Sequence, residues 1–254
     1  MTLSMEERIA QIALDVMKDL NRPDLFRAPL VSFSSARDER YARLKTIIGE
    51  WHQLPTEFLP EARSVVSYFV PFTKEVVSQP RGMKDGSPLW SEAYQEVNRR
   101  FNAVNEAVAA YLEDEGFKSV SIRSTHTYDP ADMKCFWSHR SAAVIAELGA
   151  FGANRLVITP KGSGGRFCSL ITSAPLTPAA APAEVRCLYY RNDRACGLCF
   201  GICPVKALRP DSMDKFVCQD ELNKNERLMK EITSLTSADT CGKCVSVCPL
   251  SYIA

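Results

Sequence analysis

Eight of the ten cysteines fall into two runs of similar spacing. The first run is Cys187, Cys196, Cys199 and Cys203, and the second is Cys218, Cys241, Cys244 and Cys248. Each run ends in Cys-x2-Cys-x3-Cys-Pro, which crowds three thiolates onto one turn of chain. Sets of four cysteine thiolates bind 4Fe–4S clusters, so eight thiolates account for two clusters. The sequence therefore predicts an iron–sulfur protein that transfers electrons.

The spacing resembles the bacterial ferredoxin pattern, in which the fourth cysteine of each run binds the other cluster. This pattern assigns one cluster to Cys187, Cys196, Cys199 and Cys248, and the second to Cys218, Cys241, Cys244 and Cys203. The first two cysteines of each run are more widely separated than in a compact ferredoxin repeat. For residues 188–195, inserted in the first run, we favour a surface loop over a segment that shields a cluster or meets a cofactor.

Zinc is the main alternative metal, because paired Cys-x2-Cys units also form four-cysteine zinc sites. The third closely spaced cysteine and the proline that follows it in both runs favour iron. Disulfides are typical of short secreted chains, whereas this sequence has 254 residues and opens on an acidic helical pattern rather than a signal peptide. We therefore expect a cytosolic, metal-binding protein.

The composition is that of an ordinary soluble globular chain, and it excludes two kinds of partner. The net charge of +1 gives no electrostatic footprint for nucleic acid or for an anionic membrane surface. No run reaches the roughly 18 consecutive apolar residues that a membrane span needs. We expect neither membrane insertion nor tRNA binding.

Apolar residues at helical spacing predict a helix over residues 4–20 and a longer one over residues 89–115, which Gly116 ends. We expect the aromatic and aliphatic stripe of the longer helix to pack in the core. Ser138 is expected to cap a third helix over residues 139–148, which Gly149 ends.

Apolar and β-branched runs predict strands over residues 64–72, 118–122, 156–159 and 167–172, whereas the polar stretch 123–132 predicts a loop. Strands that alternate with helices in this part of the chain predict an α/β or α+β layer.

The chain is expected to divide into two domains at a Pro- and Ala-rich segment, residues 174–186, which is typical of a semi-rigid linker. Residues 1–173 form the predicted first domain, and residues 187–254 form the predicted cluster domain. The cluster domain is short and rich in loops, so metal–thiolate bonds are expected to supply much of its folding free energy.

The segment from His139 to Pro160, HRSAAVIAELGAFGANRLVITP, resembles the middle motif of epoxyqueuosine reductase and of the reductive dehalogenases. The upstream segment Ala62–Ser67 matches an early strand of the same superfamily. The resemblance spans residues 60–254, and the nearest likeness is to a short branch of iron–sulfur proteins from anaerobes.

This resemblance implies an α+β protein, with a nitroreductase-like first domain followed by a bacterial ferredoxin-like two-cluster domain. It also implies a bound base-off cobalamin, with Gly149, Gly152, Asn154 and Thr159 lining the corrinoid cavity and the loop 162–165 near its edge. Glycines suit this role because backbone must come close to a flat macrocycle. The alternative is that these glycines only end a helix and form a tight turn.

The proton donor of the resembled reductase is an acid, and its position is occupied here by Met133. The adjacent Asp132 is therefore the candidate catalytic acid. His139 is the alternative donor, since imidazole titrates near neutrality, unless it makes a purely structural contact.

The function implied is that of a reductase supplied with electrons by a ferredoxin or flavodoxin. Electrons would pass through the two clusters to the cobalamin, which would reduce a small molecule or a corrinoid partner protein. One alternative is an electron carrier or reductive activator without a corrinoid. Another is an epoxyqueuosine reductase acting on tRNA, against which the near-neutral charge argues. The resemblance is also compatible with a homodimer.

Overall fold

The computed structural model describes residues 3–124 and 128–254. It combines helices with a sheet, 41% helical and 16% strand, which agrees with the predicted α+β class. The predicted loop 123–132 contains a two-residue strand, β4 (Tyr128–Asp129), and residues 125–127 of that prediction lie outside the described chain.

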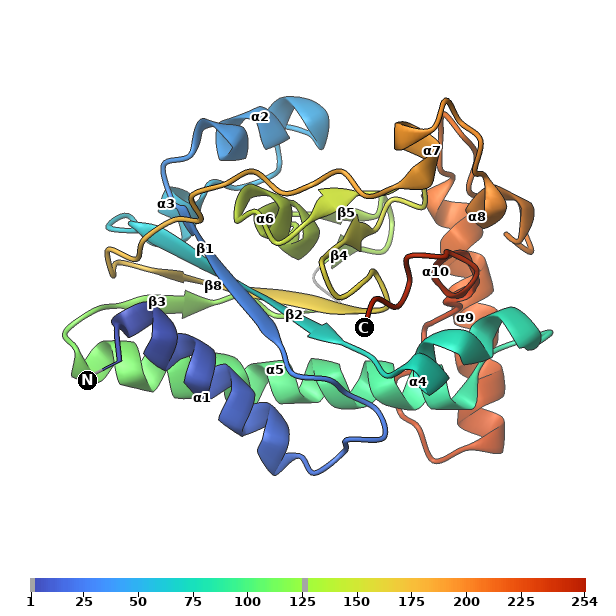
Figure 1. Cartoon of the computed structure of the whole chain (residues 1–254), viewed down its shortest axis with the longest axis horizontal. Helices are drawn as coiled ribbons and strands as arrows, with labels where there is room; N and C mark the ends of the chain where they lie inside the picture. Colours follow the sequence, from blue (N-terminus) through green and yellow to red (C-terminus); the bar gives the residue numbers. More distant parts are fainter. Residues whose placement is uncertain (1–2, 125–127) are drawn as a thin grey trace.

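An antiparallel sheet of four strands forms the centre of the molecule, in the order β1-β2-β8-β3 (Figure 1). These strands are β1 (Leu30–Ser35), β2 (Ser64–Pro71), β8 (Gly165–Thr172) and β3 (Ser119–Ser121). β2 is buried along its whole length because it pairs with β1 on one side and β8 on the other. Strands β2, β8 and β3 confirm the sequence prediction.

Two helices cover one face of the sheet, α1 (Met5–Asp19) and α5 (Pro88–Asp114) (Figure 1). Ser4 caps α1 through a complete capping box with Glu7. The predicted stripe of α5 faces the core, where Val97, Phe101 and Val108 are fully buried. These contacts join α1, α5, β2 and β8 into the main hydrophobic core.

The other face carries α2 (Glu39–Ile47), α3 (Pro55–Phe58) and α6 (His139–Ile145). Trp137 packs between them, stacked on Tyr41 and edge-on to Phe58. Ser138 caps α6 as predicted, because its hydroxyl accepts the Ser141 N–H at 3.2 Å.

The predicted end of α6 at Gly149 is wrong, because Glu147 already leaves the helix with a left-handed φ of 59°. The Glu147 carboxylate holds this conformation in place, with an ion pair to Arg40 at 2.6 Å and a bond from the Ala183 N–H at 2.7 Å. A side chain can therefore end a helix where a glycine two residues later was expected to do so.

Short elements complete the layer. They are α4 (Lys74–Ser78), a 3-10 turn (Gln79–Gly82), β5 (Lys134–Cys135), β6 (Ala150–Phe151) and β7 (Val157–Ile158). β4 pairs with β5, and β6 pairs with β7.

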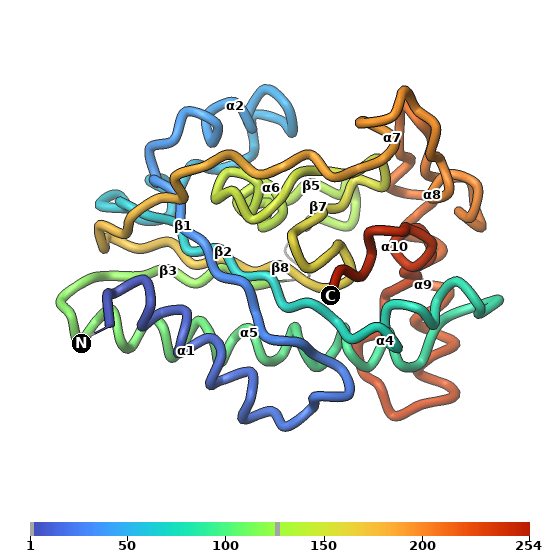
Figure 2. The backbone as a smooth tube through the Cα atoms, in the orientation of Figure 1, coloured from blue at the N-terminus to red at the C-terminus, as the bar shows by residue number. Residues whose placement is uncertain are grey.

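The segment 174–186 has no helix or strand and crosses over α6 towards the cysteine-rich part (Figure 2). Its first residues are not a free linker. Ala174 and Leu176 are buried in the main core, and the Ser64 hydroxyl donates to the Ala174 carbonyl at 2.7 Å. The two-domain division stays a prediction.

The cysteine-rich part contains α7 (Leu188–Arg191), α8 (Leu198–Gly201), α9 (Lys215–Ile232) and α10 (Lys243–Ser246). α9 lies beside the start of α5 (Figure 1). The chain after α9 also contacts α5, through a hydrogen bond of 2.8 Å between Ser91 and Thr240. The C-terminal segment returns to the sheet, with the Gly164 N–H donating to the Ser251 carbonyl at 2.8 Å. A Cβ at Gly164 would lie 2.8 Å from that oxygen, so this close approach requires glycine.

Among residues 3–124 and 128–254, no helix is both long enough and apolar enough to cross a bilayer.

Replacing Asn225 with alanine is expected to destabilise the contact that positions α9. Asn225 is fully buried, where it accepts from the Gly86 N–H at 3.1 Å and donates to the Thr240 carbonyl at 3.0 Å. Each of the two backbone groups left without a hydrogen-bond partner costs about 1–3 kcal/mol of stability, so Tm should fall by roughly 5–10 °C. The neighbouring Asn223→Ala, at a partly exposed position on the same helix, should change Tm by far less. Equal shifts for the two variants would contradict this account.

Candidate functional site

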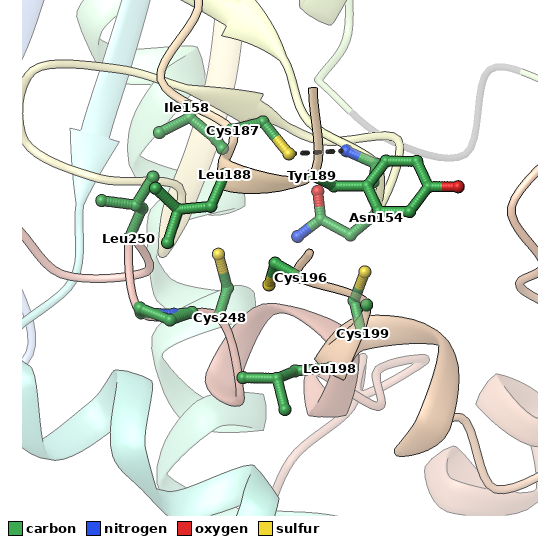
Figure 3. A pocket seen from close by; sticks show the side chains of 13 residues that line it. Asn154, Ile158, Cys187, Leu188, Tyr189, Cys196, Leu198, Cys199, Cys248 and Leu250 are labelled. Carbon is green, nitrogen blue, oxygen red and sulfur yellow. Dashed lines mark hydrogen bonds between the residues drawn. The ribbon is translucent and has the colours of Figure 1, made fainter. Parts of the chain in front are cut away.

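The first predicted cysteine set lines a single pocket. Its four thiols are Cys187, Cys196, Cys199 and Cys248 (Figure 3). They come from three separate stretches of chain, and Cys248 belongs to the second run. Apolar side chains from Ile158, Leu198 and Leu250 complete the wall.

The β6–β7 hairpin positions the first set. The Ala153 N–H donates to the Cys187 sulfur at 3.4 Å (Figure 3), and the Asn154 amide donates to the Cys244 carbonyl at 3.3 Å. Backbone N–H groups directed at sulfur stabilise thiolates and tune iron–sulfur sites. The hairpin thus joins the sheet layer to both cysteine runs.

The insert 188–195 both covers the pocket and faces solvent. Leu188 and Tyr189 line the pocket, with Tyr189 packed edge-on against Phe200 at 5.2 Å. Tyr190 and Arg191 are exposed. The favoured prediction of a surface loop is therefore correct only for part of the insert, and its first two residues shield the cysteine pocket.

The second predicted set comes from four places in the chain, with Cys218 in α9, Cys241 before α10, Cys244 in α10 and Cys203 just after α8. Burial and repulsion from neighbouring thiolates raise the pKa of Cys218 to about 11 and that of Cys244 to about 12. Cys203, from the first run, is among the neighbours that raise the pKa of Cys218, Cys241 and Cys244. Each set therefore receives one cysteine from the other run.

Two basic residues lie beside the second set. Arg140 opposes the rise in the pKa of Cys218, and Lys243 opposes the rise in the pKa of Cys241. The Lys243 ammonium is also fixed by the Met83 carbonyl. The two sets adjoin one another, since Cys199 is among the neighbours that raise the pKa of Cys244. Nothing in the sequence pattern marked Arg140 or Lys243 as part of the site.

The donor chemistry fits two cubane clusters. A cubane binds four thiolates through four different irons, so its ligands surround a volume rather than one point. The first set does surround such a volume. Among the described residues, no group of three or more His, Cys, Asp or Glu side chains converges on a single ion.

The sequence matches no protein-family model and no curated protein significantly. Solved structures are similar to the fold, however. Epoxyqueuosine reductase from Bacillus subtilis superposes with a TM-score of 0.57 at 19% identity, over 96% of this chain. A structure of epoxyqueuosine reductase with an epoxyqueuosine-modified tRNA-Tyr stem loop superposes with a TM-score of 0.56 at 20% identity, also over 96% of this chain. A reductive dehalogenase superposes with a TM-score of 0.57 at 16% identity, over 87% of this chain. The structure of that dehalogenase suggests a mechanism for B12-dependent dehalogenation.

The chain shares its fold with epoxyqueuosine reductase and with a reductive dehalogenase. This confirms the resemblance found in the sequence. The chain spans 66% of the length of the epoxyqueuosine reductases and 29% of that dehalogenase.

The residues that the superfamily resemblance assigned to a corrinoid have contacts with protein instead. A Cβ at Gly149 would lie 2.4 Å from the Ile158 carbonyl oxygen, and one at Gly152 would lie 2.9 Å from the Ile158 side chain. Thr159 is fully buried and donates to the Gly162 carbonyl at 2.8 Å. Asn154 lines the first cysteine pocket. These contacts agree with the alternative that the two glycines form a tight turn, and the assignment of the four positions to a corrinoid cavity stays a prediction.

The loop 162–165 contacts the C-terminal segment rather than an open cavity. Gly162 has a φ of 97°, and a Cβ there would lie 2.5 Å from the Ser251 carbonyl oxygen. The glycines of this loop therefore serve a close approach of two chain segments.

Asp132, the candidate catalytic acid, forms an ion pair with Lys134, and its side chain is 40% exposed. Its carboxylate accepts from Lys134, at 2.6 Å from the side chain and 2.9 Å from the backbone N–H, which lowers the pKa of Asp132. An acid in this state is ionised at neutral pH and has no proton to donate.

His139 is held as a neutral structural residue. Ser169 Oγ accepts the Trp137 indole N–H at 2.9 Å, so its own hydroxyl proton is available to His139 Nδ1 at 2.7 Å. This arrangement leaves His139 Nε2 to donate to the Arg123 carbonyl at 3.0 Å. Burial lowers the pKa of His139 to about 4. Both ring nitrogens are engaged, which favours the structural alternative over a proton donor.

The variant His139→Gln is expected to lose stability in a pH-dependent way. A histidine whose folded pKa lies below its ordinary value of 6.5 stabilises the fold fully above pH 6.5. That contribution is lost as the pH falls from 6.5 towards 4, where the folded protein must accept the proton. The difference in Tm between wild type and variant should therefore be largest at pH 7.5 and should narrow at pH 5. A constant difference would show that the neutral imidazole is not what stabilises the site.

Proposed function

We propose that this protein is an iron–sulfur oxidoreductase that passes electrons through two 4Fe–4S clusters to a substrate bound beside the second cluster. One cluster is held by Cys187, Cys196, Cys199 and Cys248, and the other by Cys218, Cys241, Cys244 and Cys203. The observation that supports this most directly is the set of four cysteines, drawn from both runs, around one pocket. The fold shared with two kinds of reductase adds to it.

The surroundings of the two sets support a direction for electron flow. The rim of the first set includes Leu198, which is 51% exposed, so a donor protein can come close to it. Lys243 and Arg140 lie beside the second set, and positive charge favours the reduced, more negative state of a cluster. Electrons would enter at the first cluster from a ferredoxin or flavodoxin and collect on the second.

Cobalamin is proposed as a second cofactor on the strength of the fold alone. A reductive dehalogenase with this fold performs B12-dependent chemistry, and the sheet layer would then be a nitroreductase-like domain ahead of a ferredoxin-like one. Because Gly149, Gly152 and Thr159 are packed against protein, we carry the electron path only as far as the second cluster. A small molecule or a corrinoid protein would be the final acceptor, in the cytosol, with the chain as a monomer or homodimer.

An electron carrier or reductive activator without a corrinoid is the competing proposal, supported by the close protein contacts at Gly149 and Gly152. An epoxyqueuosine reductase activity on tRNA is the third. A relative with this fold binds a tRNA stem loop, but the net charge of +1 argues against tRNA here.

Metal analysis of anaerobically purified protein tests the proposal. Two clusters predict about eight irons per chain, and a bound corrinoid adds about one cobalt. If iron is found without cobalt, and if adding cobalamin gives no gain in visible absorbance, the corrinoid is excluded and the electron carrier or reductive activator remains. Zinc in place of iron would remove the redox function altogether.

Paired cysteine variants test the exchange of ligands between the runs. Cys187→Ser with Cys248→Ser removes two ligands of the same proposed cluster, so about four irons should remain. Cys187→Ser with Cys203→Ser damages both clusters and should leave far less iron. If each run instead held its own cluster, these two results would be reversed. Iron content and electron paramagnetic resonance of the reduced proteins provide the measurement.

A further inference from the structure

A second pocket lies where the chain turns from the end of α1 back towards β1 (Figure 1), and we call it the α1–β1 pocket. All the residues that line it fall within residues 14–29, and none of them lines the cysteine pocket. Its volume is about 290 Å³. A cavity of about 150 Å³ is already large enough to hold benzene. The α1–β1 pocket therefore has room for a compound with a single ring or a short acyl chain.

The floor of the α1–β1 pocket is apolar. Met17 and Phe26 line it and belong to the buried main core. Leu14 and Pro29 also line it and are only partly covered. Covering such apolar surface with an apolar ligand removes it from water and favours binding.

The rim of the same pocket carries three cations, Lys18, Arg22 and Arg27. Arg22 is already neutralised, because it pairs with Asp24 and with Glu92, each at 2.7 Å. Lys18 and Arg27 have no carboxylate partner within residues 3–124 and 128–254. An anion at the rim would therefore meet these two side chains.

Arg27 is held in place by neutral groups only. Its Nη2 donates to the Ile253 carbonyl at 2.6 Å, and its Nη1 donates to the Lys161 carbonyl at 3.2 Å. The guanidinium also lies 4.4 Å from the centre of the Tyr252 ring. These contacts fix the side chain and use two of its five N–H groups. Its positive charge is left without a counterion.

A further cation lies beside Arg27. The Lys161 Nζ donates at 2.9 Å to the carbonyl of Ala28, which lines the pocket, while the Lys161 carbonyl accepts from Arg27. Burial, and then the charge of Arg27, lower the pKa of Lys161. In the described chain Lys161 has no carboxylate partner either. Two cations held together in this way repel each other, and an anion bound at the rim would relieve that repulsion.

We propose that the α1–β1 pocket binds a small organic anion with an apolar body. The anionic group would meet Arg27 and Lys18, and the apolar body would rest on Met17 and Phe26. A guanidinium suits both carboxylate and phosphate, which it binds through paired, charge-assisted hydrogen bonds. This site goes beyond the proposed electron transfer and does not depend on it.

Calorimetric titration of the anaerobically purified, iron-loaded chain at low salt tests this site. The probes are benzoate, phenyl phosphate, acetate, which has no ring, and benzyl alcohol, which has no charge. Benzoate or phenyl phosphate should bind at least about tenfold more tightly than acetate and benzyl alcohol, a difference of about 1.4 kcal/mol. The reason is that only the two aromatic anions can use both the floor and the rim. The tighter of the two identifies the anionic group that the pocket prefers.

Three variants alter the pocket. Lys18→Gln should weaken binding of the preferred aromatic anion by about two- to fivefold, the size expected of an exposed ion pair. Arg27→Gln should weaken it by about tenfold, because a fixed guanidinium makes charge-assisted hydrogen bonds. Leu14→Glu should weaken it as well, because it places a carboxylate in the wall of the pocket. Arg8→Gln is the matched control, since Arg8 is an exposed cation of the same helix that does not line the pocket, and it should leave binding unchanged.

Tm and iron content, measured on the same samples, show whether each variant is folded. Because Arg27 also holds the C-terminal segment, Lys18→Gln and Leu14→Glu decide the outcome if Arg27→Gln does not fold. The proposal is overturned if neither aromatic anion binds, if benzyl alcohol binds as tightly as they do, or if Lys18→Gln and Leu14→Glu both leave binding unchanged. None of these measurements uses electron transfer, so the iron content reports on the proposed function separately.

Discussion

The arrangement of the C-terminal part depends on one constraint, which is that each set of four thiols includes a cysteine from the other run. Cys203 and Cys248 cross between the sets, so neither set is complete until both runs have folded. Without metal, the thiols are buried close together, and burial with mutual repulsion raises the pKa of Cys199, Cys218 and Cys244. These thiols are therefore protonated at neutral pH, and metal binding must displace their protons as it forms the bonds that complete both sets, so folding and metal binding are coupled here.

The same constraint explains why the sheet layer is joined so closely to the cysteine-rich part. A metal centre has a defined electronic environment only if the groups around it are fixed. The β6–β7 hairpin supplies such groups, with the Ala153 N–H at the Cys187 sulfur and the Asn154 amide at the Cys244 carbonyl. Gly164 and Ser251 hold the end of the second run against the sheet. The motif from His139 to Pro160 thus acts as a support for the cysteine sites.

Strong local patterns in the sequence were enough to predict much of this fold. The periodic stripe of α5, the apolar run of β2 and the cap of α6 by Ser138 all form as expected, because neighbouring residues determine them. β1 and α9 were missed. The strand LVSFSS is half polar, and α9 has a mainly polar sequence whose buried residues, Glu221, Asn225 and Met229, contact distant parts of the chain. The roles of Gly149 and Thr159 also could not be predicted, because a buried turn and a cofactor cavity both call for small residues.

The surroundings of His139 and Arg140 show what only the three-dimensional arrangement can supply. Arg140 stands at the start of α6, where a sequence pattern would ordinarily indicate a solvated surface charge. In the structure Arg140 instead lies near Cys218 and opposes the rise in the pKa of that thiol. The neighbouring His139 is neutral because Ser169 and the Arg123 carbonyl occupy its two ring nitrogens, and a charged imidazole would add positive charge beside Arg140. These hydrogen bonds therefore keep a second positive charge from the start of α6.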